Sequence, residues 1–165
     1  MTSGSTLLFG AIPAELKPSA ADKRTLVQFV HTLCRRMCRS RPLICLLTGD
    51  AQLRQLNRDF LGLDYPTDVL SFPSTDFKPE IGEIAISLER AAAQAAEFGH
   101  APLDEIKILL LHGTLHLTGF DHDDGDNAMA LEENRWRAEF GLPETLIARS
   151  ARYGRRGKSR QGAAQ

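Results

Sequence analysis

The chain has 165 residues, 42% of them apolar and 25% charged, with a formal net charge of −1, which is typical of one globular domain with a sizeable core. No run approaches the roughly 18 consecutive apolar residues of a membrane-spanning helix, so we expect no contact with a membrane. The first eleven residues lack the cationic and apolar regions of a secretory signal, and we expect none.

The first part of the chain predicts strands alternating with helices. Residues 6–11 form a short apolar strand, and a helix capped by Ser19 follows, with apolar residues recurring about every 3.6 positions. Residues 43–47 are continuously apolar and have the length of a buried strand. Asp50 is placed to cap the next helix, which we expect to run to about Phe60.

Two more strands and three more helices are expected after a loop that Gly62 marks. Residues 68–72 form a short, apolar and β-prone run that predicts a strand, and Pro73 is expected to end it. Residues 81–87 alternate in polarity, which is typical of a half-exposed strand. The later helices are expected at 88–98, 102–118 and about 126–140. Strands mixed with helices, without a repeat, predict one α+β or mixed α/β domain, with no linker before residue 145.

The end of the chain differs in charge from the rest. All 21 acidic residues lie within 1–144, which hold 14 of the 20 basic residues. Residues 145–165 contain the other six cations: Arg149, Arg152, Arg155, Arg156, Lys158 and Arg160. Such a basic tail can follow a phosphate backbone, or it can be a disordered, solvated end. The sequence leaves both interpretations open.

The three cysteines indicate a reducing compartment. Cys34 and Cys38 are spaced as helix neighbours and not as a Cys-x-x-Cys pair, and Cys45 makes the number odd. Free thiols in the cytoplasm are the simpler interpretation. Cys34 and Cys38 could contribute to a metal site, but we expect all three to be small buried apolar residues.

Two histidines lie four residues apart in a leucine-rich helix. His112 and His116 share one helix face, so their imidazoles can converge on one ion. Gly119 is placed to end the helix in a left-handed conformation, and the returning chain can bring His122 to the same ion. Three protein ligands leave a coordination position open for water, as in catalytic zinc sites. The spacing therefore predicts one zinc ion per chain on His112, His116 and His122.

The same intervals occur in the metzincin protease pattern, His-Glu-x-x-His-x-x-Gly-x-x-His. Here Gly113 stands where the protease has the glutamate that acts as general base, which weakens a peptidase function but not a metal site. A structural zinc is a further alternative, although closed structural sites usually have four protein ligands.

The run from His112 to His122 resembles the signature of the YbeY family, metal-dependent endoribonucleases of ribosomal RNA maturation. The supporting segments are Leu56-Asn57, residues 64–73, residues 82–86, and Met129 with Glu132. The resemblance covers about residues 50–142, so we expect a YbeY-like domain over 1–144 and a basic tail over 145–165.

The resemblance implies a small α+β fold in which a sheet of about four strands packs against helices, with the metal helix central. It implies Zn²⁺ on the three histidines and single-stranded RNA as substrate. It also implies a role in processing small-subunit ribosomal RNA and in ribosome quality control, with the small ribosomal subunit as partner. A divergent zinc metallopeptidase and a non-catalytic ribosome-associated zinc protein remain the alternatives.

Further site residues follow from this resemblance and from position. Asp121 is expected to accept a ring N–H from a ligand histidine. Arg58, Ser71 and Phe72 are expected to bind substrate. The family often has an arginine where this chain has Leu61; Arg58 shares its helix face and could replace it, provided that the helix reaches position 61. Alternatively, Leu61 packs in the core, where an arginine would be costly.

Overall fold

The computed structural model describes residues 4–121 and 127–143. Its strands are β1 (Thr6–Phe9), β2 (Leu43–Thr48), β3 (Val69–Pro73) and β4 (Gly82–Ser87). Its α-helices are α1 (Ala20–Met37), α2 (Asp50–Leu61), α3 (Leu88–Phe98), α4 (Pro102–Leu117) and α5 (Ala128–Glu139), and a 3-10 turn, η1, spans Ala14–Leu16. Within the described ranges, no helix is long and apolar enough to cross a membrane.

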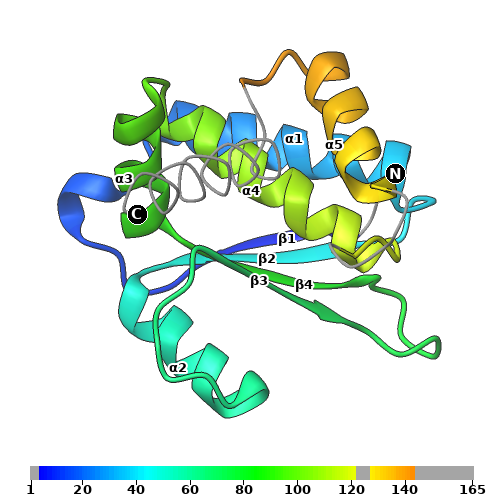
Figure 1. Cartoon of the computed structure of the whole chain (residues 1–165), viewed down its shortest axis with the longest axis horizontal. Helices are drawn as coiled ribbons and strands as arrows, with labels where there is room; N and C mark the ends of the chain where they lie inside the picture. Colours follow the sequence, from blue (N-terminus) through cyan, green and yellow to red (C-terminus); the bar gives the residue numbers. More distant parts are fainter. Residues whose placement is uncertain (1–3, 122–126, 144–165) are drawn as a thin grey trace, which may run out of the picture.

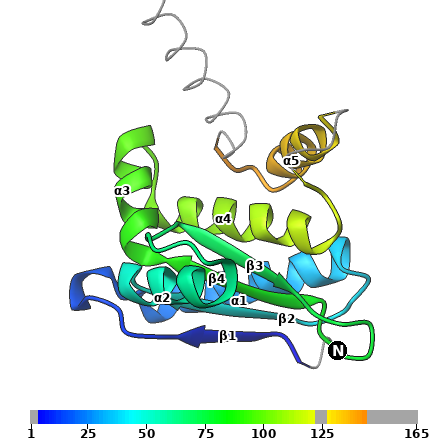
Figure 2. The ribbon, with the colours of Figure 1, turned by 60° about the horizontal axis from the view of Figure 1, so that its bottom comes forward.

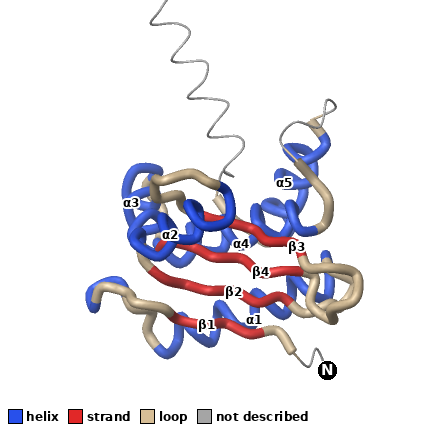
Figure 3. Tube along the Cα trace, turned by 90° about the horizontal axis from the view of Figure 1, so that it is seen from below, coloured by secondary structure: helices blue, strands red, loops and turns tan. Residues whose placement is uncertain are grey.

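The four strands form one mixed sheet with the order β1-β2-β4-β3. β1 and β4 both run parallel to β2, whereas β3 pairs antiparallel with β4. Helices α1, α3, α4 and α5 lie on one side of this sheet, and α2 lies on the other (Figure 1). Viewed from the α2 side, the strands follow one another in that order across the molecule (Figure 3). The structure is thus a single α+β domain, as the sequence predicts.

α4 is the most deeply buried helix of the described chain. Eleven of its sixteen residues are buried, among them the fully covered side chains of Ile108 to Leu111. It packs between the sheet and the helices α1, α3 and α5. Because full burial of one such side chain stabilises the fold by about 1.5–3 kcal/mol, this helix is a main source of stability as well as the carrier of two histidines.

The cysteines belong to the same core. Cys34, Cys38 and Cys45 are at most 2% exposed, and all three are free thiols. Burial raises the pKa of Cys38 to about 12 and also raises that of Cys45. The prediction that they act as small apolar residues is confirmed.

The second face of the sheet explains why one strand prediction is wrong. We expected residues 81–87 to be half exposed, but in β4 only Glu83 is exposed. β4 lies between β2 and β3, and α2 covers its other face through a small cluster of Leu53, Leu70 and Ala85. The alternating polarity of residues 81–87 therefore does not separate a buried face from an exposed one, because both faces of β4 are covered.

Smaller differences occur at element ends. Gly49, not Asp50, is the N-cap of α2, and the Asp50 carboxylate instead accepts a hydrogen bond from the Ser87 hydroxyl at 2.6 Å. Pro73 is the last residue of β3 and not a stop before it, because β3 is an edge strand of the described sheet. α2 reaches Leu61 before Gly62 ends it at a φ of 70°.

Candidate metal centre

The end of α4 is shaped by a glycine turn. Gly119 has a φ of 102°; its N–H donates to the His116 carbonyl, and the Phe120 N–H donates to the Leu115 carbonyl, both at 3.1 Å. This is the pair of bonds of a Schellman motif, which glycine favours because it lacks a Cβ. The turn brings the Phe120 carbonyl to within 3.0 Å of His116 Nδ1. The helix end thus orients one of the predicted ligands.

His112 and His116 point their Nε2 atoms at each other across 3.3 Å. On the opposite side of its ring, His112 Nδ1 lies 3.1 Å from an Oε2 atom of Glu133 on α5. His112 and Glu133 are both buried, at 4% and 0% exposure, whereas His116 is partly exposed. Each ring is therefore held through Nδ1, and both present Nε2 to one point.

The hydrogen bonds at Nδ1 determine which tautomer each neutral imidazole adopts. A carbonyl oxygen only accepts, so His116 Nδ1 carries the hydrogen and its Nε2 carries a lone pair in the neutral ring. The Glu133 carboxylate sets the same tautomer in His112. Two zinc–nitrogen bonds of about 2.0–2.1 Å at a tetrahedral angle place their nitrogens about 3.3–3.4 Å apart. The observed separation of 3.3 Å fits a shared metal ion.

The third predicted ligand, His122, lies in the segment 122–126, outside the described residues. The described residues alone contain no group of three His, Cys, Asp or Glu side chains placed to hold a metal. The structure thus brings together two of the three predicted ligands, and the complete set stays a prediction.

A cleft of about 730 Å³ opens above the two histidines. Its wall consists of Leu61 at the end of α2, of β3 with the residues before it, and of Asp121. In full, the lining residues are Leu61, Thr67, Asp68, Val69, Leu70, Ser71, Pro73, His112, His116 and Asp121. They include two carboxylates and no lysine or arginine.

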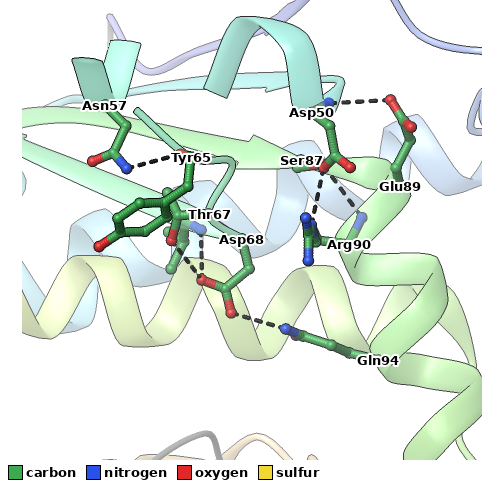
Figure 4. Close-up of polar contacts among 10 residues, drawn as sticks. Asp50, Asn57, Tyr65, Thr67, Asp68, Ser87, Glu89, Arg90 and Gln94 are labelled. Carbon is green, nitrogen blue, oxygen red and sulfur yellow. Dashed lines mark hydrogen bonds and ion pairs between the residues drawn. The ribbon is translucent and has the colours of Figure 1, made fainter. Parts of the chain in front are cut away.

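Polar contacts fix the loop that forms one end of this wall (Figure 4). The Asp68 carboxylate accepts from the Val69 N–H at 2.8 Å and from the Gln94 side chain, on α3, at 3.0 Å. Asn57 on α2 donates to the Tyr65 carbonyl at 2.9 Å. The loop is thereby tied to helices on both sides of the sheet, so the cleft has a fixed wall.

The four other predicted site residues fall in different places. Asp121 and Ser71 line the cleft; the Ser71 hydroxyl donates to the Gly113 carbonyl at 3.1 Å and links β3 to α4. Arg58 is exposed on α2 and outside the lining, 3.5 Å from Asp59. Phe72 lies on the other face of the sheet, where its ring packs 5.2 Å from that of Phe60.

Position 113 shows why the protease pattern does not carry over. A Cβ added at Gly113 would lie 2.9 Å from Ser71 Oγ and 3.1 Å from Ile84 Cγ2. This side of α4 faces the sheet, so the glutamate of a peptidase has no room there and could not reach a substrate. The packing of Gly113 against the sheet is therefore a steric argument against a peptidase function, in addition to the missing glutamate.

Glu133 is the residue of the candidate site that the sequence analysis missed. It lies four residues after Met129 and three before Trp136, and all three are buried on one face of α5. A glutamate at a core position of an amphipathic helix is the signal that could have found it, since buried carboxylates need partners.

Fold and site together define a class: a small α+β domain whose buried central helix aims two histidines into a cleft. Comparison with known proteins makes this specific. The family profile described as Endoribonuclease YbeY matches residues 16–139, and the chain belongs to this family.

Relatives named Endoribonuclease YbeY occur in several bacteria. The protein of Solibacter usitatus is 50% identical over 146 residues, which cover 88% of this chain and 95% of the relative. That of Campylobacter fetus is 42% identical, with 64% of this chain and 79% of the relative covered. The solution structure of TM1509 from Thermotoga maritima has a TM-score of 0.54 at 23% identity, covering 82% of this chain and 91% of that one, which supports the fold.

Proposed function

We propose that the chain is a zinc-dependent endoribonuclease that cleaves single-stranded RNA at the cleft above α4. The observation that carries this proposal is the pair of Nε2 atoms 3.3 Å apart, each in a ring whose Nδ1 is already held by an acceptor. The family relationship supports RNA as the substrate and hydrolysis of a phosphodiester as the reaction.

A zinc ion held by His112, His116 and His122 would polarise a phosphodiester oxygen as a Lewis acid. The chain's own part is to hold that site rigid. Glu133 and the Phe120 carbonyl fix the two imidazoles, and Ser71 ties the cleft wall to α4 beside them. Asp121 lines the cleft, and we propose that its carboxylate accepts a ring N–H from a ligand histidine.

The cleft itself supports a metal requirement. Its described lining carries the carboxylates of Asp68 and Asp121 but no cationic side chain, so it does not attract phosphate by itself. A divalent ion would reverse the local charge, and the basic residues of 145–165, outside the described ranges, would add cations for the flanking phosphates.

An exposed apolar segment that reaches the cleft at Leu61 supports a single-stranded substrate. Phe60, Leu61, Leu63 and Tyr65 are 68%, 55%, 41% and 53% exposed within six consecutive residues. Leu61 also lines the cleft. Unpaired bases stack on such surfaces, at about 1–3 kcal/mol per base on aromatic rings, whereas paired bases are not accessible. We propose Tyr65 for this role; Phe60 packs against Phe72 in a separate groove on the other face of the sheet.

We further propose small-subunit ribosomal RNA as the substrate, in the cytoplasm and in ribosome quality control, with the small ribosomal subunit as partner. The support for this further proposal is the family relationship and the basic composition of residues 145–165. The non-catalytic alternative, a ribosome-associated protein with structural zinc, predicts binding to the same RNA without cleavage.

The test uses a labelled single-stranded RNA and a duplex of the same sequence. The purified chain should cleave the single strand, lose this activity with a chelator and regain it with zinc. His116→Ala, which removes a partly exposed ligand, should fold and bind RNA but not cleave it. Chelator-resistant cleavage would contradict the metal mechanism. RNA binding without cleavage by the zinc-loaded chain would favour the non-catalytic alternative.

A further inference from the structure

α5 is attached to the rest of the domain by aromatic and cationic contacts. The Trp136 ring stacks on the Phe140 ring at 5.4 Å, and Phe140 meets Phe29 of α1 edge-on at 5.3 Å. The Arg36 guanidinium, also from α1, lies 5.1 Å from the Trp136 ring centre and pairs with Glu139 at 2.8 Å. These contacts lie at the C-terminal end of α5, one turn from its polar contact with α4 and on the same buried face.

That polar contact is between Glu133 and His112. Figure 2 shows α5 beside the end of α4 that carries the histidines. Glu133 Oε2 lies 3.1 Å from His112 Nδ1, and the two side chains are only 1% and 5% exposed. A buried carboxylate costs free energy unless a positive group offsets it. A neutral imidazole offsets it weakly, whereas an imidazole that binds a cation through Nε2 polarises its Nδ1–H and offsets it better.

We propose that Glu133 is a positioning residue that couples metal binding at His112 to the docking of α5. This inference rests on the proposed zinc site. Metal binding strengthens the contact of His112 with Glu133 and so holds α5 against α4. In turn, docked α5 fixes the His112 tautomer and the ring orientation that bind metal.

The coupling has an expected size and must act in both directions. Removal of a carboxylate that orients a ligand histidine typically weakens metal affinity by about 10- to 100-fold. Linkage requires that the metal shift the docking equilibrium of α5 by the same factor. Zinc should therefore slow hydrogen exchange of the α5 amides, residues 128–139, by at least tenfold wherever this exchange proceeds through undocking.

The experiment compares the full chain with Glu133→Gln and Glu132→Gln. The first variant removes the charge at His112 with little change in shape. The second removes a neighbouring carboxylate of α5 that contacts Arg135 and Trp136 and not a histidine. Zinc affinity is measured by chelator competition, and α5 protection by hydrogen exchange with and without zinc.

We expect Glu133→Gln to weaken zinc binding 10- to 100-fold and to lose the zinc-dependent protection of α5. The zinc affinity of Glu132→Gln should stay within about twofold of that of the parent. Equal zinc affinity of Glu133→Gln and the parent would overturn the inference. Hydrogen exchange of the α5 amides that is the same with and without zinc in the parent would also overturn it. Either result leaves the proposed function intact. A parent chain that binds no zinc would instead refute the proposed function itself.

Discussion

The substitution Leu61→Arg adds a cation at the edge of a cleft whose described lining has none. Leu61 is the last residue of α2 and is 55% exposed, so an arginine there reaches solvent and the cleft without entering the core. The alternative that Leu61 packs in the core is therefore wrong. Less than half of the leucine is buried, so its loss costs under about 1.4 kcal/mol, and the melting temperature should fall by less than about 5 °C.

The gain is expected in catalysis. A charged hydrogen bond to phosphate contributes about 1.5–3 kcal/mol, which is about 10- to 100-fold in rate if it forms mainly in the transition state. Initial rates on single-stranded RNA measure this effect, with zinc content as a check. Leu63→Arg is the matched control, because Leu63 is 41% exposed but outside the cleft lining. Equal rates for Leu61→Arg, Leu63→Arg and the parent would refute the expected phosphate contact.

Other perturbations test separate parts of the structure. Gly113→Glu should lower the free energy of unfolding by about 1–3 kcal/mol, because its Cβ meets Ser71 and Ile84, and should produce no peptidase activity; an equally stable variant would contradict this packing. Deletion of residues 145–165 should weaken RNA binding and reduce the slope of log K against log salt concentration by up to about 4. An unchanged slope would show that the tail is only a solvated end. At pH 8 the buried thiols, with raised pKa values at Cys38 and Cys45, should resist iodoacetamide until guanidinium unfolds the chain; rapid native alkylation would contradict their burial.

Local rules predicted α4, the helix that carries the two histidines, well. The four-residue spacing of His112 and His116 and the glycine turn at Gly119 are set by helix geometry and backbone sterics, which act within a few residues. The described structure keeps both features, and the turn adds the Phe120 carbonyl as a partner of His116. The same rules predicted the elements and their order along the chain.

Contacts between distant segments were not predictable in this way. Glu133 lies 21 residues from His112, and only the docking of α5 brings them together. The burial of both faces of β4 depends on where α2 packs. The separation of Ser71 from Phe72 was in fact available from the sequence, because neighbouring residues of a strand point to opposite faces, so both could not line one cleft.

The central claim is that one zinc ion binds on His112, His116 and His122. Elemental analysis of the purified full chain, beside the variant with all three histidines replaced by alanine, tests it most directly. We predict one zinc per chain in the parent and none in the variant, with secondary structure retained in both. Stoichiometric zinc in the triple variant, or a parent that takes up no zinc when it is supplied, would contradict the account.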